Sequence, residues 1–159
     1  MRYTALMTRL IFTTLALSLF PLAAAAQVRI IVPSQHQKKY ETIQVSVDNA
    51  GRKPVTFCTD QGQTSPKGGG EIETTPSPFW VQRHENGSWG TLMIGPDVGS
   101  LKSTEVLDPG KSVKFAFRLA DSGQMRLRLN YWNGSLEDLD CRTPPKGAKL
   151  VTSAVFKVE

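Results

Sequence analysis

The chain has 159 residues, of which 40% are hydrophobic, and it carries a formal net charge of +5. Its lysines and arginines are spread along the sequence without a clustered run, which argues against a nucleic-acid partner. The length suits one domain with a hydrophobic core of its own.

The first 26 residues have the layout of a secretory signal peptide. A basic start is followed by the apolar run "LIFTTLALSLF" and by small residues that lead up to Gln27. This order predicts cleavage before Gln27 and a secreted or periplasmic protein without a membrane anchor. The alternative is an uncleaved anchor, because residues 10–26 are almost long enough to span a bilayer. Pro21 breaks the run, and this favours cleavage.

Residues 27–159 are expected to form one domain made of strands. Apolar and polar residues alternate in several runs with the period of two that is typical of half-buried strands. Turn sequences rich in Asn, Asp, Gly and Pro separate these runs, and no window of a dozen residues has a helical period. The expected strands cover residues 28–32, 43–47, 55–58, 79–83, 89–94, 113–119, 125–131 and 151–158. Many short strands separated by such turns predict an all-β antiparallel sandwich or barrel.

Two segments, 59–78 and 133–149, have no periodicity and are rich in Gly, Pro, Ser and Thr. We expect both to be long loops at the surface, where loops often carry function.

Several stretches in a fixed order resemble the bacterial immunoglobulin-like (Big-type) domains of extracytoplasmic proteins. They are "VSVDNAGRKPVTF", "PFWVQRHENGSWGTL", "LDPGKSVKFAFRL", "GQMRLRLNY" and the closing "AVFKV". The resemblance implies an immunoglobulin-like antiparallel β-sandwich of about seven to eight strands. It carries over no catalytic residue.

The chain has two cysteines, Cys58 and Cys141. In an exported protein such a pair is expected to form a disulfide, which here would fasten the two long loops to each other. The alternative is a redox or metal-binding thiol, and the wide spacing without a CxxC motif argues against it.

Aromatic residues indicate where a partner could bind. Alternation along the strands turns Trp80 outward between Phe79 and Val81, and Trp132 outward beside Tyr131. An exposed tryptophan can stack on a sugar ring or anchor a protein. A bridge between the loops would therefore create one candidate binding surface, with Trp80, Trp132, Arg142 and Lys146. The alternative is that the loops cover one or both tryptophans.

Trp89 follows an Asn-Gly turn and is expected in the core at the start of its strand.

Metal and catalytic sites are not expected. His36 and His84 are far apart in polar surroundings, and both are interpreted as surface residues. The acids Glu137, Asp138 and Asp140 could bind calcium, although such spacing is common in solvated loops. No GxSxG, HExxH or phosphate-binding loop occurs, so neither an enzyme nor a cofactor is predicted.

The sequence therefore favours an exported, non-catalytic immunoglobulin-like module that binds an unknown protein or glycan, or that has a structural role in the envelope. The alternative is a secreted β-sandwich protease inhibitor that inserts the segment 63–78 into a protease. Three consecutive glycines in that segment argue against a preorganised inhibitory loop.

Overall fold

A computed structural model describes residues 27–59, 78–92, 103–136, 139–141 and 146–159. The predicted signal peptide lies outside these ranges. No helix among the described residues is long and apolar enough to cross a membrane. The strands in chain order are β1 Val28–Ile31, β2 His36–Gln37, β3 Thr42–Asn49, β4 Val55–Thr59, β5 Trp80–Glu85, β6 Ser88–Thr91, β7 Ser103–Leu107, β8 Ser112–Arg118, β9 Gly123–Asn133, β10 Lys149–Thr152 and β11 Phe156–Val158.

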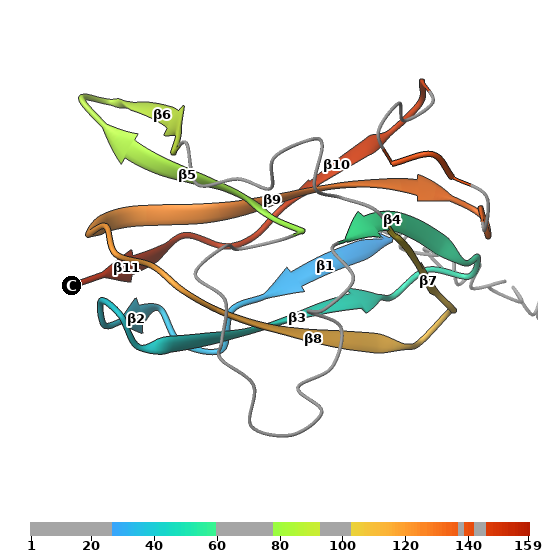
Figure 1. The fold of residues 1–159 in the computed structure, drawn as a ribbon, viewed down its shortest axis with the longest axis horizontal. Coiled ribbons are helices and arrows are strands. Elements are labelled where there is room, and N and C mark those ends of the chain that lie inside the picture. The colour runs from blue at the N-terminus through green and yellow to red at the C-terminus, as the bar shows by residue number, and fades with distance from the viewer. Residues whose placement is uncertain (1–26, 60–77, 93–102, 137–138, 142–145) are drawn as a thin grey trace, which may run out of the picture.

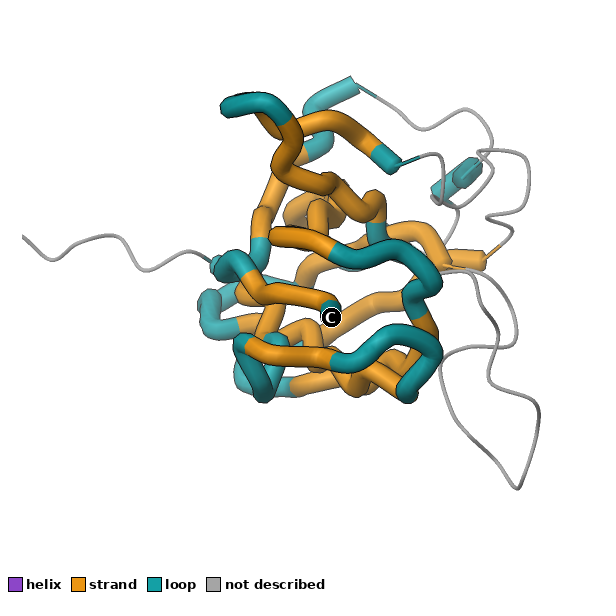
Figure 2. The backbone as a smooth tube through the Cα atoms, turned by 90° about the vertical axis from the view of Figure 1, so that its left-hand side faces the viewer, coloured by secondary structure: helices purple, strands orange, loops and turns teal. Residues whose placement is uncertain are grey.

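These strands form two layers, so the predicted all-β, immunoglobulin-like sandwich is confirmed. One layer is the three-stranded antiparallel sheet β1-β3-β8. The other is a larger sheet with the order β2-β11-β9-β4-β7, to which β10, β5 and β6 are added through β9 and β5. The layers face each other in Figure 1, and Figure 2 shows them from one end. The large sheet is antiparallel except for the pairing of β11 with β2.

The central strand of the large sheet is β9, which pairs with four others. β10 and β11 follow one another along one of its edges, at Arg128–Tyr131 and Gly123–Met125. β5 and β4 follow one another along the opposite edge, at Met125–Arg128 and Trp132–Asn133. The outward side chains of β5 and β9 therefore share one continuous surface.

The single strand expected at 151–158 is in fact two strands, β10 and β11. Between them the buried Ser153 hydroxyl accepts a hydrogen bond from the Leu127 N–H at 2.9 Å and donates one to the Ala154 carbonyl at 2.7 Å. A side chain thus replaces a backbone partner of the ladder, which interrupts the strand without leaving a buried N–H unpaired.

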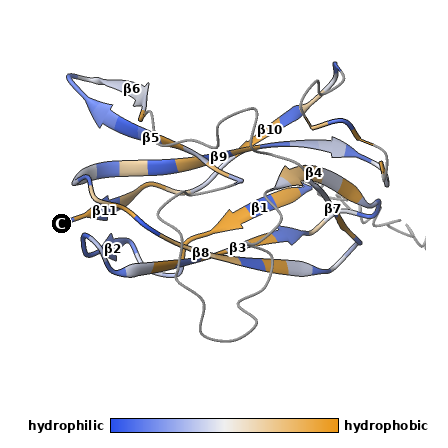
Figure 3. Cartoon of the chain, in the orientation of Figure 1, coloured by the Kyte–Doolittle hydropathy of each residue, from blue (hydrophilic) through white to orange (hydrophobic). Residues whose placement is uncertain are grey.

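The hydrophobic core lies between the two sheets and contains the residues that alternation assigned to the inside. Along β9, for example, Met125, Leu127 and Leu129 are buried, whereas the residues between them are at least partly exposed. This alternation is visible as changing colour along the strands in Figure 3. The rings of Phe79 and Phe115 meet edge to face, with centroids 5.3 Å apart.

One buried polar residue, Asn49, ties a corner of the sandwich together. Its side-chain nitrogen donates hydrogen bonds to the carbonyls of Leu107 at 2.8 Å and Lys53 at 2.9 Å, and its side-chain oxygen accepts one from the Gly51 N–H. The end of β3 is thereby joined to the end of β7 and to the segment that follows β3.

Candidate functional site: the outer face of β5, β6 and β9

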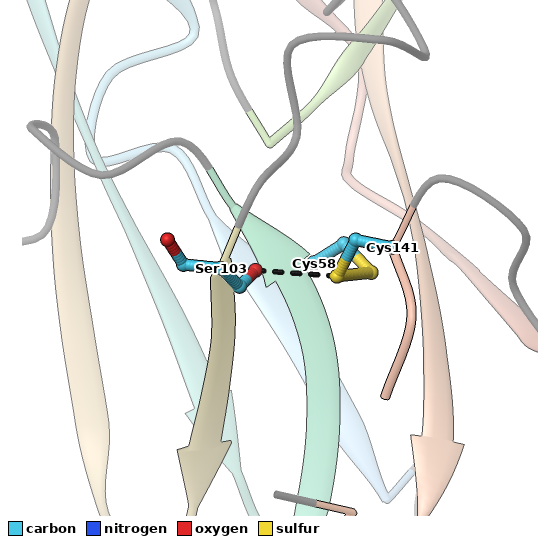
Figure 4. The surroundings of a disulfide bond; sticks show 3 residues. All are labelled: Cys58, Ser103 and Cys141. Carbon is cyan, nitrogen blue, oxygen red and sulfur yellow. Dashed lines mark hydrogen bonds between the residues drawn. A yellow bond between two sulfur atoms is a disulfide. The ribbon is translucent and has the colours of Figure 1, made fainter. Parts of the chain in front are cut away.

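The predicted pairing of the two cysteines is present in the structure. Cys58 on β4 and Cys141 beyond β9 form a disulfide with 5.6 Å between their Cα atoms. The sulfur of Cys141 lies 3.3 Å from the carbonyl oxygen of Ser103, at the start of β7 (Figure 4). The bridge therefore fastens the segment after β9 to β4, beside β7.

Trp132 is buried, so its predicted place on an exposed surface is wrong. Alternation does turn it away from the main core, but only 7% of its surface is exposed. It belongs to a second, smaller cluster with Cys58 and Cys141, against which Leu136 and Leu139 pack. The segment after β9 folds back over the indole and is held there by the disulfide. For Trp132, the alternative that a loop covers the tryptophan is therefore the one that the structure shows.

Two hydrogen bonds to one hydroxyl hold this fold-back in place. Thr56 Oγ1 donates to the Gly134 carbonyl at 2.7 Å and accepts from the Leu136 N–H at 3.0 Å. Thr56 is fully buried and lies directly opposite Trp132 in the ladder between β4 and β9.

Of the remaining residues of the predicted surface, the structure describes Trp80 and Lys146. Trp80 is half-buried on the outer side of β5, and Lys146 is exposed beyond the disulfide. Arg142 lies outside the described residues. The same holds for Glu137 and Asp138 of the calcium hypothesis and for nearly all of the segment 63–78 that the inhibitor hypothesis needs, whereas Asp140 is exposed.

The two histidines have separate surroundings. His36 lies 3.7 Å from the carboxylate of Glu159, whereas His84 packs on Trp89 with ring centroids 5.1 Å apart. No group of three or more potential metal ligands occurs in the described part of the chain.

The tryptophan expected in the core, Trp89, instead lies on the outer face of the large sheet. Asn86 and Gly87 both have positive φ, 48° and 80°, which is the geometry of a two-residue hairpin turn. That turn places Trp89 directly opposite His84 and therefore on the same face as His84. The core expectation fails because the hairpin of β5 and β6 extends beyond the sandwich, as Figure 1 shows.

Arg126 of β9 reaches across β5 and lies on this tryptophan. Its guanidinium carbon is 4.2 Å from the centre of the Trp89 ring, and its Nε donates a hydrogen bond of 2.9 Å to Gln82 Oε1. Stacking on an indole and a bond to the inner nitrogen together fix the plane of the guanidinium. Next along the face, Arg128 lies directly opposite Trp80.

Acidic side chains are absent from the outward positions of β5, β6 and β9 in the described residues. Glu85 and Asp121 form ion pairs with Arg83, whose side chain alternates to the other side of β5. Within the described chain neither Arg126 nor Arg128 forms an ion pair. Among the described residues, this outer face thus combines aromatic rings with positive charge that no ion pair neutralises.

Shifted pKa values occur elsewhere in the molecule. Burial raises the pKa of Glu105, on β7 opposite Phe57, and also that of Tyr131. The hydrogen bond from Lys157 lowers the pKa of Glu159. None of these residues is on β5 or β6 or among the outward residues of β9.

No protein-family model matches the chain, and no curated protein matches it. Membership of the Big-type family therefore stays a prediction.

Two solved structures are similar at low identity. One is the "ASH / PapD-like domain of human CEP192 (PapD-like domain 7)", with 13% identity, 84% of each chain covered and a TM-score of 0.35. The other is AvmM, described by the words "AvmM Catalyzes Macrocyclization in Alchivemycin A Biosynthesis", with 15% identity, 82% of this chain and 87% of that chain covered, and a TM-score of 0.33. Similarity at this level assigns no activity, partner or residue role to this chain.

Proposed function

We propose that this protein is an exported, non-catalytic binding module that uses the outer face of β5, β6 and β9 to hold a partner at the cell surface or in the periplasm. The signal-peptide pattern of the first 26 residues and the Cys58–Cys141 disulfide support export.

The observation that carries the proposal is the pairing of Trp80 with Arg128 beside the group formed by Trp89, His84 and Arg126. Tryptophan and arginine are the residue types that contribute most to binding at protein surfaces. Here they lie on strands of a rigid sheet, which lowers the entropic cost of presenting them to a partner.

Retention on native envelope material tests the proposal. Labelled protein that begins at Gln27 is incubated with the cell-envelope fraction of its source organism, washed, and measured in the bound fraction. We expect retention to fall about tenfold or more in the double variant Trp80→Ala, Arg128→Ala, since each change removes a contact residue of the face.

The matched control is Tyr40→Ala, Arg118→Ala, which also removes one aromatic residue and one arginine, both exposed and away from β5, β6 and β9. Thermal unfolding of both variants verifies that they are folded. Equal retention of the two double variants would contradict the proposed surface, and a free protein that still carries residues 1–26 would contradict the proposed export.

A further inference from the structure

The guanidinium of Arg126 is oriented before any partner arrives. Its Nε donates a hydrogen bond to Gln82, and its guanidinium carbon lies over the ring of Trp89. Gln82 is itself buried, with 6% of its surface exposed, so its carboxamide is a fixed acceptor rather than a mobile one. The two terminal nitrogens have no acidic partner among the described residues. A planar fork held in this way is suited to bind both oxygens of one carboxylate or sulfate.

Arg128 supplies a second positive charge on the same face. Outward residues of one strand repeat about every 6.5–7 Å, so Arg126 and Arg128 form a short row along β9. Trp80 lies directly opposite Arg128 and is half-buried. An aromatic surface thus adjoins the row of charges.

We propose, building on the binding function above, that the ligand of this face is an acidic polysaccharide whose sugar rings carry carboxylate or sulfate groups. Arg126 binds an acidic group through its two terminal nitrogens. Trp80 stacks on the apolar face of a sugar ring, and Arg128 pairs with an acidic group beside that ring.

The combination of groups favours a glycan over an acidic peptide. Arginines alone would bind any polyanion. The half-buried Trp80 beside them adds a flat apolar side chain that can pack on a sugar ring, whereas an aspartate or glutamate side chain offers no such ring to pack on.

Binding to defined polymers tests this assignment. Protein from Gln27 onward is titrated by calorimetry with polygalacturonate, alginate and chondroitin sulfate. Fully methyl-esterified polygalacturonate keeps the rings but lacks the charges, and poly-L-glutamate keeps the charges but lacks the rings. We expect binding to at least one of the three acidic glycans and at least tenfold weaker binding to both comparison polymers.

Two substitutions assign the contacts. Arg126→Lys keeps the charge but loses the planar fork, and Trp80→Ala removes the stacking surface; each is expected to weaken glycan binding about tenfold. Lys114→Ala, on the outer side of β8, should leave it unchanged. Arg126→Lys also separates orientation from charge, because a purely electrostatic site would tolerate it.

Binding to none of the three acidic glycans would overturn the assignment. So would equal binding of poly-L-glutamate, which would indicate a general polyanion site, or equal binding of the esterified polymer. These failures are distinguishable from failure of the proposed function, because retention on envelope material that still depends on Trp80 and Arg128 would leave the binding module intact with a different ligand.

Discussion

At the scale of single residues, Asn49 shows how a buried polar side chain stabilises this sandwich. Only 1% of its surface is exposed, and its three hydrogen bonds join the end of β3 to the end of β7 and to the segment after β3. Asn49→Ala would leave the carbonyl of Leu107 without this donor in a buried setting. We expect it to lower the free energy of unfolding by about 2–4 kcal/mol in a urea titration. Asn130→Ala, at an exposed position of β9, should change it by less than about 0.5 kcal/mol. Similar losses in both variants would contradict the role of Asn49.

Residues also show where prediction from the sequence fails. The hairpin turn at Asn86–Gly87 was sufficient to place Trp89 opposite His84, but a tryptophan next to a turn is equally typical of a core. The burial of Trp132 depends on a fold-back fixed by Thr56 and by the disulfide, and no local pattern encodes these long-range contacts. Arg126 and Arg128 are visible as outward residues in the sequence, whereas the support of Arg126 by Gln82 needs the register of two strands.

At the scale of elements, alternation was reliable wherever a strand has one buried face, and β8 allows a direct test. Phe117 is fully buried, whereas Lys114 on the same strand is exposed. We expect Phe117→Ala to lower the free energy of unfolding by about 3–5 kcal/mol and Lys114→Ala by less than about 0.5 kcal/mol, measured by denaturant titration. Equal effects would mean that the register of β8 against β3 is wrong.

Elements without a clean alternation escaped prediction. In β7 the half-buried Glu105 lies directly opposite Phe57 of β4. The sequence "STEVL" therefore lacks the apolar pattern of an internal strand. β2 has only two residues, too few for any period to appear. Both are defined by pairing with distant strands, β4 and β11, rather than by their own composition.

At the scale of the whole molecule, the disulfide closes a large loop of the chain. Cys58 and Cys141 are 83 positions apart, and in the chain-entropy model such a link is worth about 4–5 kcal/mol. The free energy of unfolding of the double variant Cys58→Ser, Cys141→Ser should therefore be lower by about that amount, and the variant should unfold at a lower denaturant concentration. The unsubstituted protein in reductant should behave like the variant, and thiol labelling of the native exported protein should detect no free cysteine. An unchanged unfolding curve would show that the bridge does not stabilise the fold.

The position of β9 among its partners also determines when the molecule can fold. β4 and β5 precede it in the chain, whereas β10 and β11 follow it, so both of its edges are occupied only after residue 158 has been synthesised. Pairings between such distant segments form slowly, because a long loop must close before any contact compensates for the lost chain entropy. A nascent chain of this protein therefore lacks its completed large sheet until β11 has been synthesised, and an incompletely folded chain is the form that the proposed export through a narrow translocation channel requires.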